Sequence, residues 1–346
     1  MNRQDYMAGY KAARTSANPA LAEHWVDRGL ESGVEDWQFH RIKGDFHRSR
    51  GEWLEARDRY ERAITLAPHE DVPLAMLARV SMHFREFDVA ARLLRRAIEL
   101  APRKAPWHVN LGTCELKLGN LAAARRALAQ AEALDPKQAQ QRMIADIDRR
   151  IASGTITTEA TQGFYDDVYG GDGAYLEPWR KTPYAETWKG IAQLLEPNGP
   201  RSILDLGCGP GQFAECVAEL LPDATYHGVD FSSVAVERGK ARVPGYQFSR
   251  LVLPTASYDR FAPFDTVVCT EVLEHVDADI DVLRPIPSGT YVAFSVPNFD
   301  SFGHVRVFSS EKAVRSRYGD LFRRLDIRPF QLNAASILWL GHGVRA

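Results

Sequence analysis

One stretch of the chain, residues 201–232, constrains the fold more than any other. It reads RSILDLGCGPGQFAECVAELLPDATYHGVDFS, which is a short apolar strand, a glycine-rich turn, a helical segment and a second strand that ends at Asp230. A strand, glycine turn, helix and strand in this order belong to a parallel sheet that binds an adenosine-containing ligand at the carboxyl ends of its strands. The stretch therefore predicts both a fold class and the place of a ligand.

The spacing of the glycines separates two kinds of ligand. A dinucleotide-binding turn needs G-x-G-x-x-G, in which the last glycine stands inside the helix and admits a pyrophosphate. Residues 205–211 read D-x-G-x-G-x-G instead, and Gln212 and Phe213 stand where that later glycine would be. This pattern resembles motif I of the class I S-adenosylmethionine-dependent methyltransferases.

The resemblance implies that S-adenosylmethionine is the cofactor. In that family the turn encloses the amino-acid part of the cofactor, and the acid after the second strand, here Asp230, holds the ribose hydroxyls. The residues expected to contact the cofactor are Asp205, Gly207, Cys208, Gly209, Gly211, Asp230, Phe231, Ser232 and Tyr184.

Five further apolar segments are expected to complete a Rossmann-like, seven-stranded α/β sheet. They lie at 246–251, 264–269, 290–296, 324–330 and 336–344. The last two segments would form an antiparallel hairpin at the edge of the sheet. The family usually has an acid near the end of the third strand, which contacts the adenine amine. This chain has Arg250 and its neighbours there, so the adenine contact is left unassigned.

The first half of the chain repeats every 34 residues. Pro68, Pro102 and Pro136 close the similar phrases AITLAP, AIELAP and AEALDP, and a glycine or alanine stands 24 positions before each proline. This pattern resembles the tetratricopeptide repeat, in which helix pairs stack on one another to bury their apolar faces. The resemblance predicts an N-terminal all-α array with repeats at about 37–68, 71–102 and 105–136, flanked by capping helices.

The chain is therefore expected to contain two domains. A tetratricopeptide-repeat domain would span residues 1–152 and a class I methyltransferase domain residues 153–346, with the polar segment 153–160 at the boundary. The repeats would either bind a peptide, a protein partner or a second copy of the chain, or serve only as a packing domain.

Composition limits the partners and the compartment. The net charge of −2 argues against a general polyanion binder, so nucleic acid is not an expected partner. The four cysteines lack metal-ligand spacing, and no apolar run reaches the length of a signal peptide or a membrane span. We expect a cytoplasmic protein with free thiols and no membrane partner.

A segment rich in tyrosine and tryptophan, residues 164–197, precedes the sheet. Similar leader segments in small-molecule methyltransferases fold over the cofactor and form part of a substrate lid. Tyr165 and Tyr175 are expected to contact the acceptor, and Tyr169 and Tyr184 are further candidates. Alternatively, these aromatic side chains only fix the segment to the sheet.

Acidic and imidazole groups follow the fourth and fifth strands. Glu271, Glu274 and His275 share one face if a helical turn begins after the fourth strand. His304 and Arg306 follow the fifth strand and can approach the same cleft, because ligands bind at the carboxyl ends of the strands. Arg306 is a candidate clamp for an anionic group of the acceptor.

This pattern supports three interpretations. E-x-x-E-H with a later histidine resembles the small-RNA 3′-end 2′-O-methyltransferases and the ubiquinone-biosynthesis O-methyltransferases. That resemblance implies a divalent ion such as Mg²⁺, held by Glu271, Glu274, His275 and His304, which lowers the pKa of an acceptor hydroxyl. Alternatively, His275 or His304, with Glu274 beside them, acts directly in catalysis as a general base. In the third interpretation these residues only shape the loop.

The predicted activity is methylation of an oxygen or nitrogen atom of a small molecule, such as a sugar or a natural-product intermediate. The sulfonium is already activated, so catalysis requires in-line positioning and the removal of a proton. The alternatives are a protein or peptide methyltransferase recruited through the repeats, an RNA 2′-O-methyltransferase, and a non-catalytic repeat scaffold.

Overall fold

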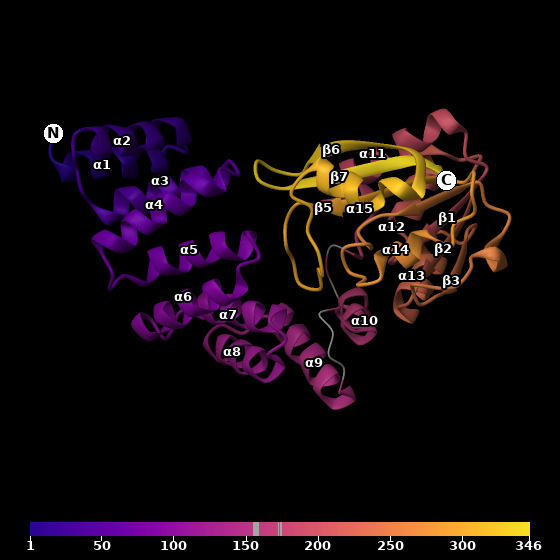
Figure 1. The fold of residues 1–346 in the computed structure, drawn as a ribbon, viewed down its shortest axis with the longest axis horizontal. Coiled ribbons are helices and arrows are strands. Elements are labelled where there is room, and N and C mark those ends of the chain that lie inside the picture. The colour runs from indigo at the N-terminus through magenta and orange to yellow at the C-terminus, as the bar shows by residue number, and fades with distance from the viewer. Residues whose placement is uncertain (155–158, 172, 174) are drawn as a thin grey trace. The chain divides into compact units, whose positions relative to one another are not determined.

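The computed structural model describes residues 1–154, 159–171, 173 and 175–346. They form two compact units, one of residues 1–147 with 333–335 and the other of residues 148–332 with 336–346 (Figure 1). The expected boundary segment, 153–160, lies partly outside the described residues.

The first unit is built from helices that pair in sequence. Each odd-numbered helix from α1 to α7 packs on the helix that follows it, and successive pairs stack on one another. The helices are α1 (Arg3–Thr15), α2 (Pro19–Glu31), α3 (Trp37–Ser49), α4 (Trp53–Leu66), α5 (Asp71–His83), α6 (Phe87–Leu100), α7 (Ala105–Lys117), α8 (Leu121–Leu134) and α9 (Gln138–Ser153), the last of which continues into the second unit. The three helix pairs predicted from the 34-residue period are α3–α4, α5–α6 and α7–α8.

Small residues allow the two helices of a pair to approach closely. A Cβ atom on Gly44 would lie 2.6 Å from Cε1 of Tyr60, and one on Gly112 would lie 2.7 Å from Cγ of Leu128. Tyr60 and Leu128 are completely buried. The repeated small residue in the sequence therefore marks the contact between the two helices, as predicted.

The second unit contains a seven-stranded sheet in the order β3-β2-β1-β4-β5-β7-β6. The strands β1 to β5 are parallel, and β7 runs antiparallel to both β5 and β6. Their bounds are β1 (Ser202–Leu206), β2 (Thr225–Asp230), β3 (Gln247–Arg250), β4 (Thr266–Cys269), β5 (Tyr291–Pro297), β6 (Phe322–Gln331) and β7 (Ile337–Arg345). The predicted strands and the antiparallel edge hairpin are confirmed.

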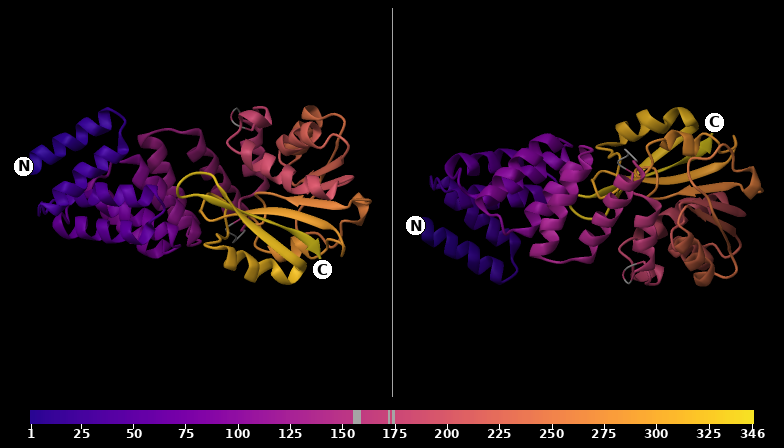
Figure 2. Two further views of the ribbon diagram at one scale, coloured as in Figure 1. Left: turned by 90° about the horizontal axis from the view of Figure 1, so that it is seen from above. Right: turned by 90° about the horizontal axis from the view of Figure 1, so that it is seen from below.

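Helices cover both faces of this sheet (Figure 2). One face packs on α11 (Ala185–Leu195), α12 (Gln212–Leu220) and α13 (Ser233–Arg242), and the other on α14 (Asp279–Leu283) and α15 (Glu311–Tyr318). The helix α10 (Gln162–Gly170) precedes the sheet. Short 3₁₀ turns, η1 (Trp179–Lys181), η2 (Glu196–Asn198), η3 (Asp259–Phe261) and η4 (Gly319–Leu321), complete the unit.

The order of the strands predicts the place of a ligand crevice, because the direction in which strands are added to the sheet reverses beside β1. The chain runs from β1 outward through β2 to β3, and then returns to the other side of β1 to form β4 and β5. Ligands of open α/β sheets bind outside the carboxyl ends of the strands at such a reversal. The crevice is therefore expected between the loops that follow β1 and β4.

The structure also describes the cysteines and the apolar character of the helices. The four cysteines, Cys114, Cys208, Cys216 and Cys269, are buried free thiols, as predicted. In the described part of the chain, no helix combines the length and the apolar character needed to cross a bilayer.

Candidate active site

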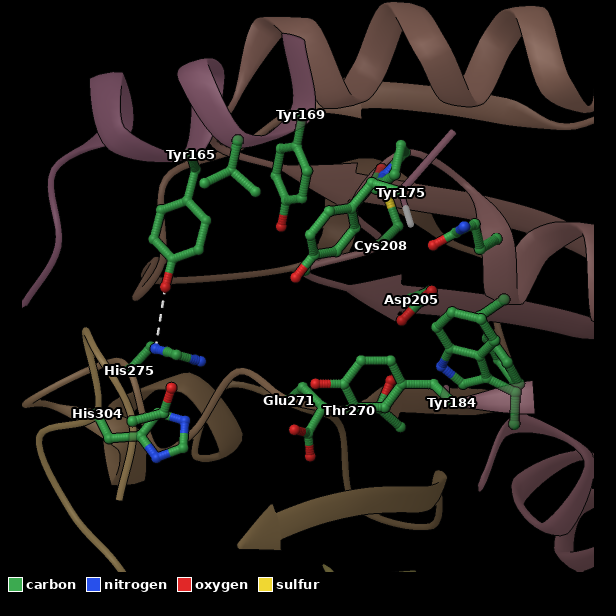
Figure 3. Close-up of a pocket in the computed structure, with 18 of the residues that line it drawn as sticks. Tyr165, Tyr169, Tyr175, Tyr184, Asp205, Cys208, Thr270, Glu271, His275 and His304 are labelled. Atoms are coloured by element: carbon green, nitrogen blue, oxygen red, sulfur yellow. Dashed lines mark hydrogen bonds between the residues drawn. The ribbon is translucent and has the colours of Figure 1, made fainter. Parts of the chain in front are cut away.

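A cavity of about 280 Å³ lies at the carboxyl ends of the central strands. One wall comes from the glycine turn after β1, and the opposite wall from the loops after β4 and β5 (Figure 3). The third wall is aromatic and comes from the segment that precedes the sheet. It consists of Phe164, Tyr165, Tyr169, Tyr175, Tyr184 and Trp188.

The glycine turn is held mainly by its own backbone. The amides of Gly207 and Cys208 donate hydrogen bonds to the carbonyl oxygen of Val229, at 2.7 and 3.0 Å, which joins the turn to the end of β2. Gly207 has a φ of +78°, and a Cβ atom there would lie 2.3 Å from Cγ2 of Val272. Neither the backbone conformation nor the available space admits a side chain at this position.

Asp230 closes the turn from the end of β2. Its Oδ2 accepts a hydrogen bond from the amide of Gly209 at 3.0 Å, and its Oδ1 accepts one from the amide of Ser232 at 2.8 Å. Burial raises the pKa of Asp230 to about 6, although these two amide hydrogen bonds act in the opposite direction. Asp230 and Phe231 line a second cavity of about 150 Å³, which shares Gly207 with the first.

Asp205 lies at the end of β1 and is 1% exposed. The hydroxyl of Tyr226 donates a hydrogen bond to its Oδ2, whereas its Oδ1 is buried and has no hydrogen-bond partner within the described ranges. Burial raises the pKa of Asp205 to about 7, and the Tyr226 hydroxyl opposes this increase. Asp205 lines the same cavity as the glycine turn.

The remaining residues expected at the cofactor are also placed near the turn. Cys208, Gly209 and Tyr184 line the first cavity. Gly211, with a φ of +81°, is the N-cap residue that precedes α12. Ser232 caps α13 and donates a hydrogen bond to Oδ1 of Asp166 at 2.5 Å.

The predicted helical face after β4 is wrong. Glu271 has a φ of +55°, in the left-handed region, so the chain turns away from helical geometry at this residue. Its amide donates to Oγ of Ser295, and this hydroxyl donates to Oε1 of Glu271, both at 2.9 Å. The pair fixes the carboxyl group at the cavity, and burial raises its pKa to about 7. A left-handed backbone at a non-glycine residue is strained and is common at functional sites.

Three side chains converge beyond Glu271. Glu274, His275 and His304 each offer a ligand atom within 4.8 Å of the others, and Glu271 is not part of this described group. The Glu271 backbone directs its carboxyl group to Ser295 instead, which corrects the four-ligand set expected from the sequence. Glu274 is completely buried, and neither of its carboxyl oxygens has a hydrogen-bond partner within the described ranges. Burial, and then the charge of Glu271, raise the pKa of Glu274 well above its usual range.

The two imidazole rings of this group lie 4.7 Å apart, at 76° to one another. Nδ1 of His304 is 3.2 Å from the carbonyl oxygen of Phe299. A carbonyl oxygen only accepts, so Nδ1 carries the proton in this hydrogen bond and the neutral ring keeps a lone pair on Nε2. Nδ1 of His275 is 2.9 Å from the hydroxyl of Tyr165.

Arg306 does not line the cavity, which corrects its expected role as a clamp for the acceptor. Its guanidinium donates to the carbonyl oxygens of Leu273, Val276 and Asp277 and lies 3.2 Å from a carboxylate oxygen of Asp279. Arg306 therefore braces the loop that carries Glu274 and His275. The sequence places it near the cleft but does not show that the loop carbonyls use its donors.

Several residues of the site were not among the residues expected to contact the cofactor or the acceptor. Trp188 and Thr270 line the cavity, Ser295 holds Glu271, and Tyr226 holds Asp205. Tyr226 was in principle accessible, because Asp205 pairs with Gly228 in the parallel register and Tyr226 lies two residues earlier on the same face of β2. The position of Trp188 at the cavity depends on the path of the leader segment, and no periodic pattern in the sequence predicts that path.

Two family models match this chain. Residues 204–286 match a model described as a methyltransferase domain. Residues 4–141 match a tetratricopeptide-repeat model described as the C-terminal domain of cilia and flagella-associated protein 70.

Curated relatives match parts of the chain. A trans-aconitate 2-methyltransferase from Streptomyces avermitilis is 32% identical over 159 residues, which cover 42% of this chain and 58% of the relative. A ubiquinone biosynthesis O-methyltransferase from Paracidovorax citrulli is 32% identical over 113 residues, which cover 30% of this chain and 47% of the relative. The chain thus spans about half the length of the curated relatives that it matches.

Solved structures resemble parts of the chain. The crystal structure of MamA has 17% identity and a TM-score of 0.38, with 42% of this chain and 85% of that chain covered. The methyltransferase domain of bacterial CtHen1-C has 16% identity and a TM-score of 0.39, with 47% of this chain and 99% of that chain covered.

Together, the sheet, the glycine turn and the match over residues 204–286 define a methyltransferase domain of the S-adenosylmethionine-dependent class I type. In this chain the domain follows helical repeats of the tetratricopeptide type, as the sequence predicts.

Proposed function

We propose that this chain transfers the methyl group of S-adenosylmethionine to an oxygen or nitrogen atom of a small molecule, such as a sugar or a natural-product intermediate. One observation carries the proposal. The glycine turn with Asp205 and the loops with Glu271, His275 and His304 line the same cavity. A cofactor bound at the turn would therefore present its methyl group to an acceptor held beside proton-accepting groups.

The residues divide between the two tasks of this reaction. On the cofactor side, Asp205 would bind the amino-acid part and Asp230 the ribose, as in the family that the turn resembles. On the acceptor side, His304 is the preferred general base, because its hydrogen bond to Phe299 leaves the lone pair on Nε2. Tyr175 and Tyr184 would hold the acceptor between aromatic rings.

The lining of the cavity favours an acceptor without multiple negative charges. No lysine or arginine is among the described residues that line it, and Asp205 and Glu271 are acidic. A tricarboxylate such as trans-aconitate, named in the relatives, would meet these carboxyl groups without a cation to balance it. An uncharged acceptor with a hydroxyl group suits the aromatic wall better.

The group of Glu274, His275 and His304 favours metal-assisted transfer as a second candidate mechanism. Glu274 presents two buried carboxyl oxygens that have no hydrogen-bond partner among the described residues, and a cation would satisfy them. One carboxylate and two imidazoles suit Mn²⁺ or Zn²⁺ better than Mg²⁺, because imidazole is a softer ligand than oxygen. A bound ion would lower the pKa of an acceptor hydroxyl.

Calorimetry and an acceptor screen test the main proposal. The full chain is titrated with S-adenosylhomocysteine, and release of this product from S-adenosylmethionine is then followed with catechol and with trans-aconitate as acceptors. Binding of the product, and turnover of catechol in preference to trans-aconitate, are the expected results. Failure to bind S-adenosylhomocysteine would refute the methyltransferase proposal, and preferred turnover of trans-aconitate would refute the argument from the charge of the cavity.

Exhaustive chelation tests the metal. If a divalent ion is needed, turnover falls after chelation and returns when Mn²⁺ is added. Turnover that persists after chelation rules out the metal and leaves the histidine base as the mechanism.

We propose that the repeats bind a polypeptide or a second copy of the chain. We also propose that the repeat domain spans residues 1–152 and the methyltransferase domain residues 153–346. The support is the match of residues 4–141 to a repeat model. Sedimentation of the full chain over a range of concentrations separates self-association from a monomer that needs another partner.

The four buried free thiols support a reducing compartment such as the cytoplasm.

A further inference from the structure

Tyr165 joins the leader segment to the acceptor side of the cavity. It lies on α10, and its hydroxyl is 2.9 Å from Nδ1 of His275, which is 110 residues later in the chain (Figure 3). The two rings meet edge to face, with centroids 5.9 Å apart. This contact fixes both the distance and the orientation of the imidazole relative to α10.

The opposite side of this hydrogen bond is closed by backbone. Gly303 has a φ of +83°, and a Cβ atom there would lie 3.2 Å from Nδ1 of His275 and 3.3 Å from the hydroxyl of Tyr165. These distances are tighter than those of ordinary Cβ contacts. The chain before His304 therefore passes directly over the Tyr165–His275 pair, and the absence of a side chain there leaves room for it.

The helix that carries Tyr165 is anchored to the cofactor side of the site. Asp166, the next residue, accepts the hydrogen bond from Ser232, whose amide binds Asp230. The guanidinium of Arg250 donates to Oε1 of Gln162 at 2.7 Å and to the carbonyl oxygen of Phe231 at 3.1 Å. Arg250 stands in the stretch where the related family usually has an acid for the adenine. That departure from the family pattern supplies an anchor for α10.

We propose that Tyr165 is a positioning residue for His275 rather than an acceptor-binding residue, and that α10 sets this imidazole from the cofactor side. In this arrangement Nδ1–H of His275 donates to the hydroxyl oxygen of Tyr165, so the neutral ring keeps its lone pair on Nε2.

His304 has the same arrangement, because its Nδ1 donates to the carbonyl oxygen of Phe299. In both imidazoles Nε2 is then the nitrogen that carries the lone pair, which is the atom that acts as a base or binds a metal. A hydrogen bond of this kind at the far nitrogen is the usual way in which proteins select the tautomer and the orientation of a functional histidine. The inference rests on the proposed function of the site.

Nuclear magnetic resonance of the imidazole nitrogens tests the tautomer directly. Long-range proton–nitrogen spectra of the ¹⁵N-histidine-labelled full chain are recorded above neutral pH, and a His275→Gln variant identifies the signal of His275. The wild type is expected to show the tautomer with the proton on Nδ1. Tyr165→Phe removes the acceptor, so this pattern is expected to be lost in favour of a mixture of tautomers.

Tyr169→Phe is the matched control. It removes a hydroxyl from a cavity-lining tyrosine one turn later on α10, and it should leave the His275 signal as in the wild type. An unchanged His275 signal in Tyr165→Phe would overturn the proposal. So would the tautomer with the proton on Nε2 in the wild type, because the Tyr165 hydroxyl would then be the donor.

Calorimetry with S-adenosylhomocysteine separates positioning from cofactor binding. A positioning role predicts that Tyr165→Phe binds this ligand within about twofold of the wild type. A tenfold loss would make Tyr165 a cofactor contact and refute the proposal. If the wild type does not bind S-adenosylhomocysteine, the proposed methyltransferase function fails, whereas the tautomer spectra still report whether Tyr165 orients His275.

Discussion

The site has two sides, named the cofactor wall and the acceptor wall after their proposed ligands, and they are built in different ways. The cofactor wall comes mainly from the continuous run 205–211 and from Asp230, and backbone amides hold most of it together. The acceptor wall comes from three separate segments, and side-chain contacts such as Glu271–Ser295 and Tyr165–His275 hold it together. A site made by backbone geometry leaves a readable spacing in the sequence, whereas a site made by converging side chains does not. The same difference predicts how each wall responds to substitution.

The largest expected effect is on the acceptor wall. His304→Ala removes the proposed base, so turnover should fall by about 100-fold or more, while the affinity for S-adenosylhomocysteine stays the same. Steady-state kinetics with an acceptor found in the screen, together with calorimetry, measure the two effects. His69→Ala, an exposed histidine of the first unit, is the control. Near-wild-type turnover of His304→Ala would remove this residue from the mechanism.

Asp230→Ala is the corresponding test of the cofactor wall. The charged carboxylate is expected to form two hydrogen bonds with the ribose, so its loss should weaken binding of S-adenosylhomocysteine about 100-fold. Asp223→Ala, an exposed acid before β2, should bind as the wild type does. Because Asp230 also receives two backbone amides, circular dichroism must show that the variant is folded. An unchanged affinity in a folded variant would contradict the ribose assignment.

Asp205→Asn separates stability from binding within the cofactor wall. The folded state raises the pKa of Asp205 from 3.8 to about 7, so it holds the proton more tightly than the unfolded state does. Protonated Asp205 therefore contributes to the free energy of unfolding. This contribution is fully present below pH 3.8 and is lost as the pH rises through about 7. Above that pH, Asp205→Asn should be more stable than the wild type by up to about 4 kcal/mol.

Urea unfolding at both ends of this pH range, with Asp223→Asn as the control, measures the difference. The variant should also bind S-adenosylhomocysteine more weakly, because it lacks the carboxylate. A variant no more stable than the wild type above pH 7 would show that Asp205 does not destabilise the folded chain.

The smallest expected effect concerns the anchor between the two walls. Arg250→Ala removes the donor to Gln162 and Phe231 but leaves Tyr165 and His275 intact. Affinity for S-adenosylhomocysteine should fall only about threefold, because an exposed hydrogen bond contributes little, while the His275 tautomer becomes mixed. Lys240→Ala, an exposed residue of α13, is the control. A His275 spectrum identical to that of the wild type would show that α10 does not need this anchor.

Much of the fold could be predicted from the sequence, because its signals are local. The 34-residue period marks helix pairs whose contact needs a small residue, such as Gly44 opposite Tyr60. The apolar strands and the glycine turn were equally explicit. The structure brings Asp205, Asp230 and the glycine turn together at one end of the sheet, and their roles towards the cofactor stay predictions.

The acceptor wall could be predicted only in part, because its geometry depends on contacts between distant segments. The spacing of Glu271, Glu274 and His275 suggested a helical face, but a left-handed residue at Glu271 breaks it. Arg306 was expected to serve the acceptor, whereas it binds loop carbonyls. In both cases the decisive partner is far away in sequence and leaves no periodic pattern.

The buried carboxyl group of Asp205 has a consequence for cofactor uptake. With a pKa of about 7, it carries a proton in much of the empty protein near neutral pH. If the ammonium group of the proposed cofactor binds against this residue, it needs the carboxylate, so loading the site would release that proton into solution. Uptake of the methyl donor would then exchange a proton for an ammonium, and it would become more favourable as the pH rises towards about 8, where the ammonium itself begins to lose its charge.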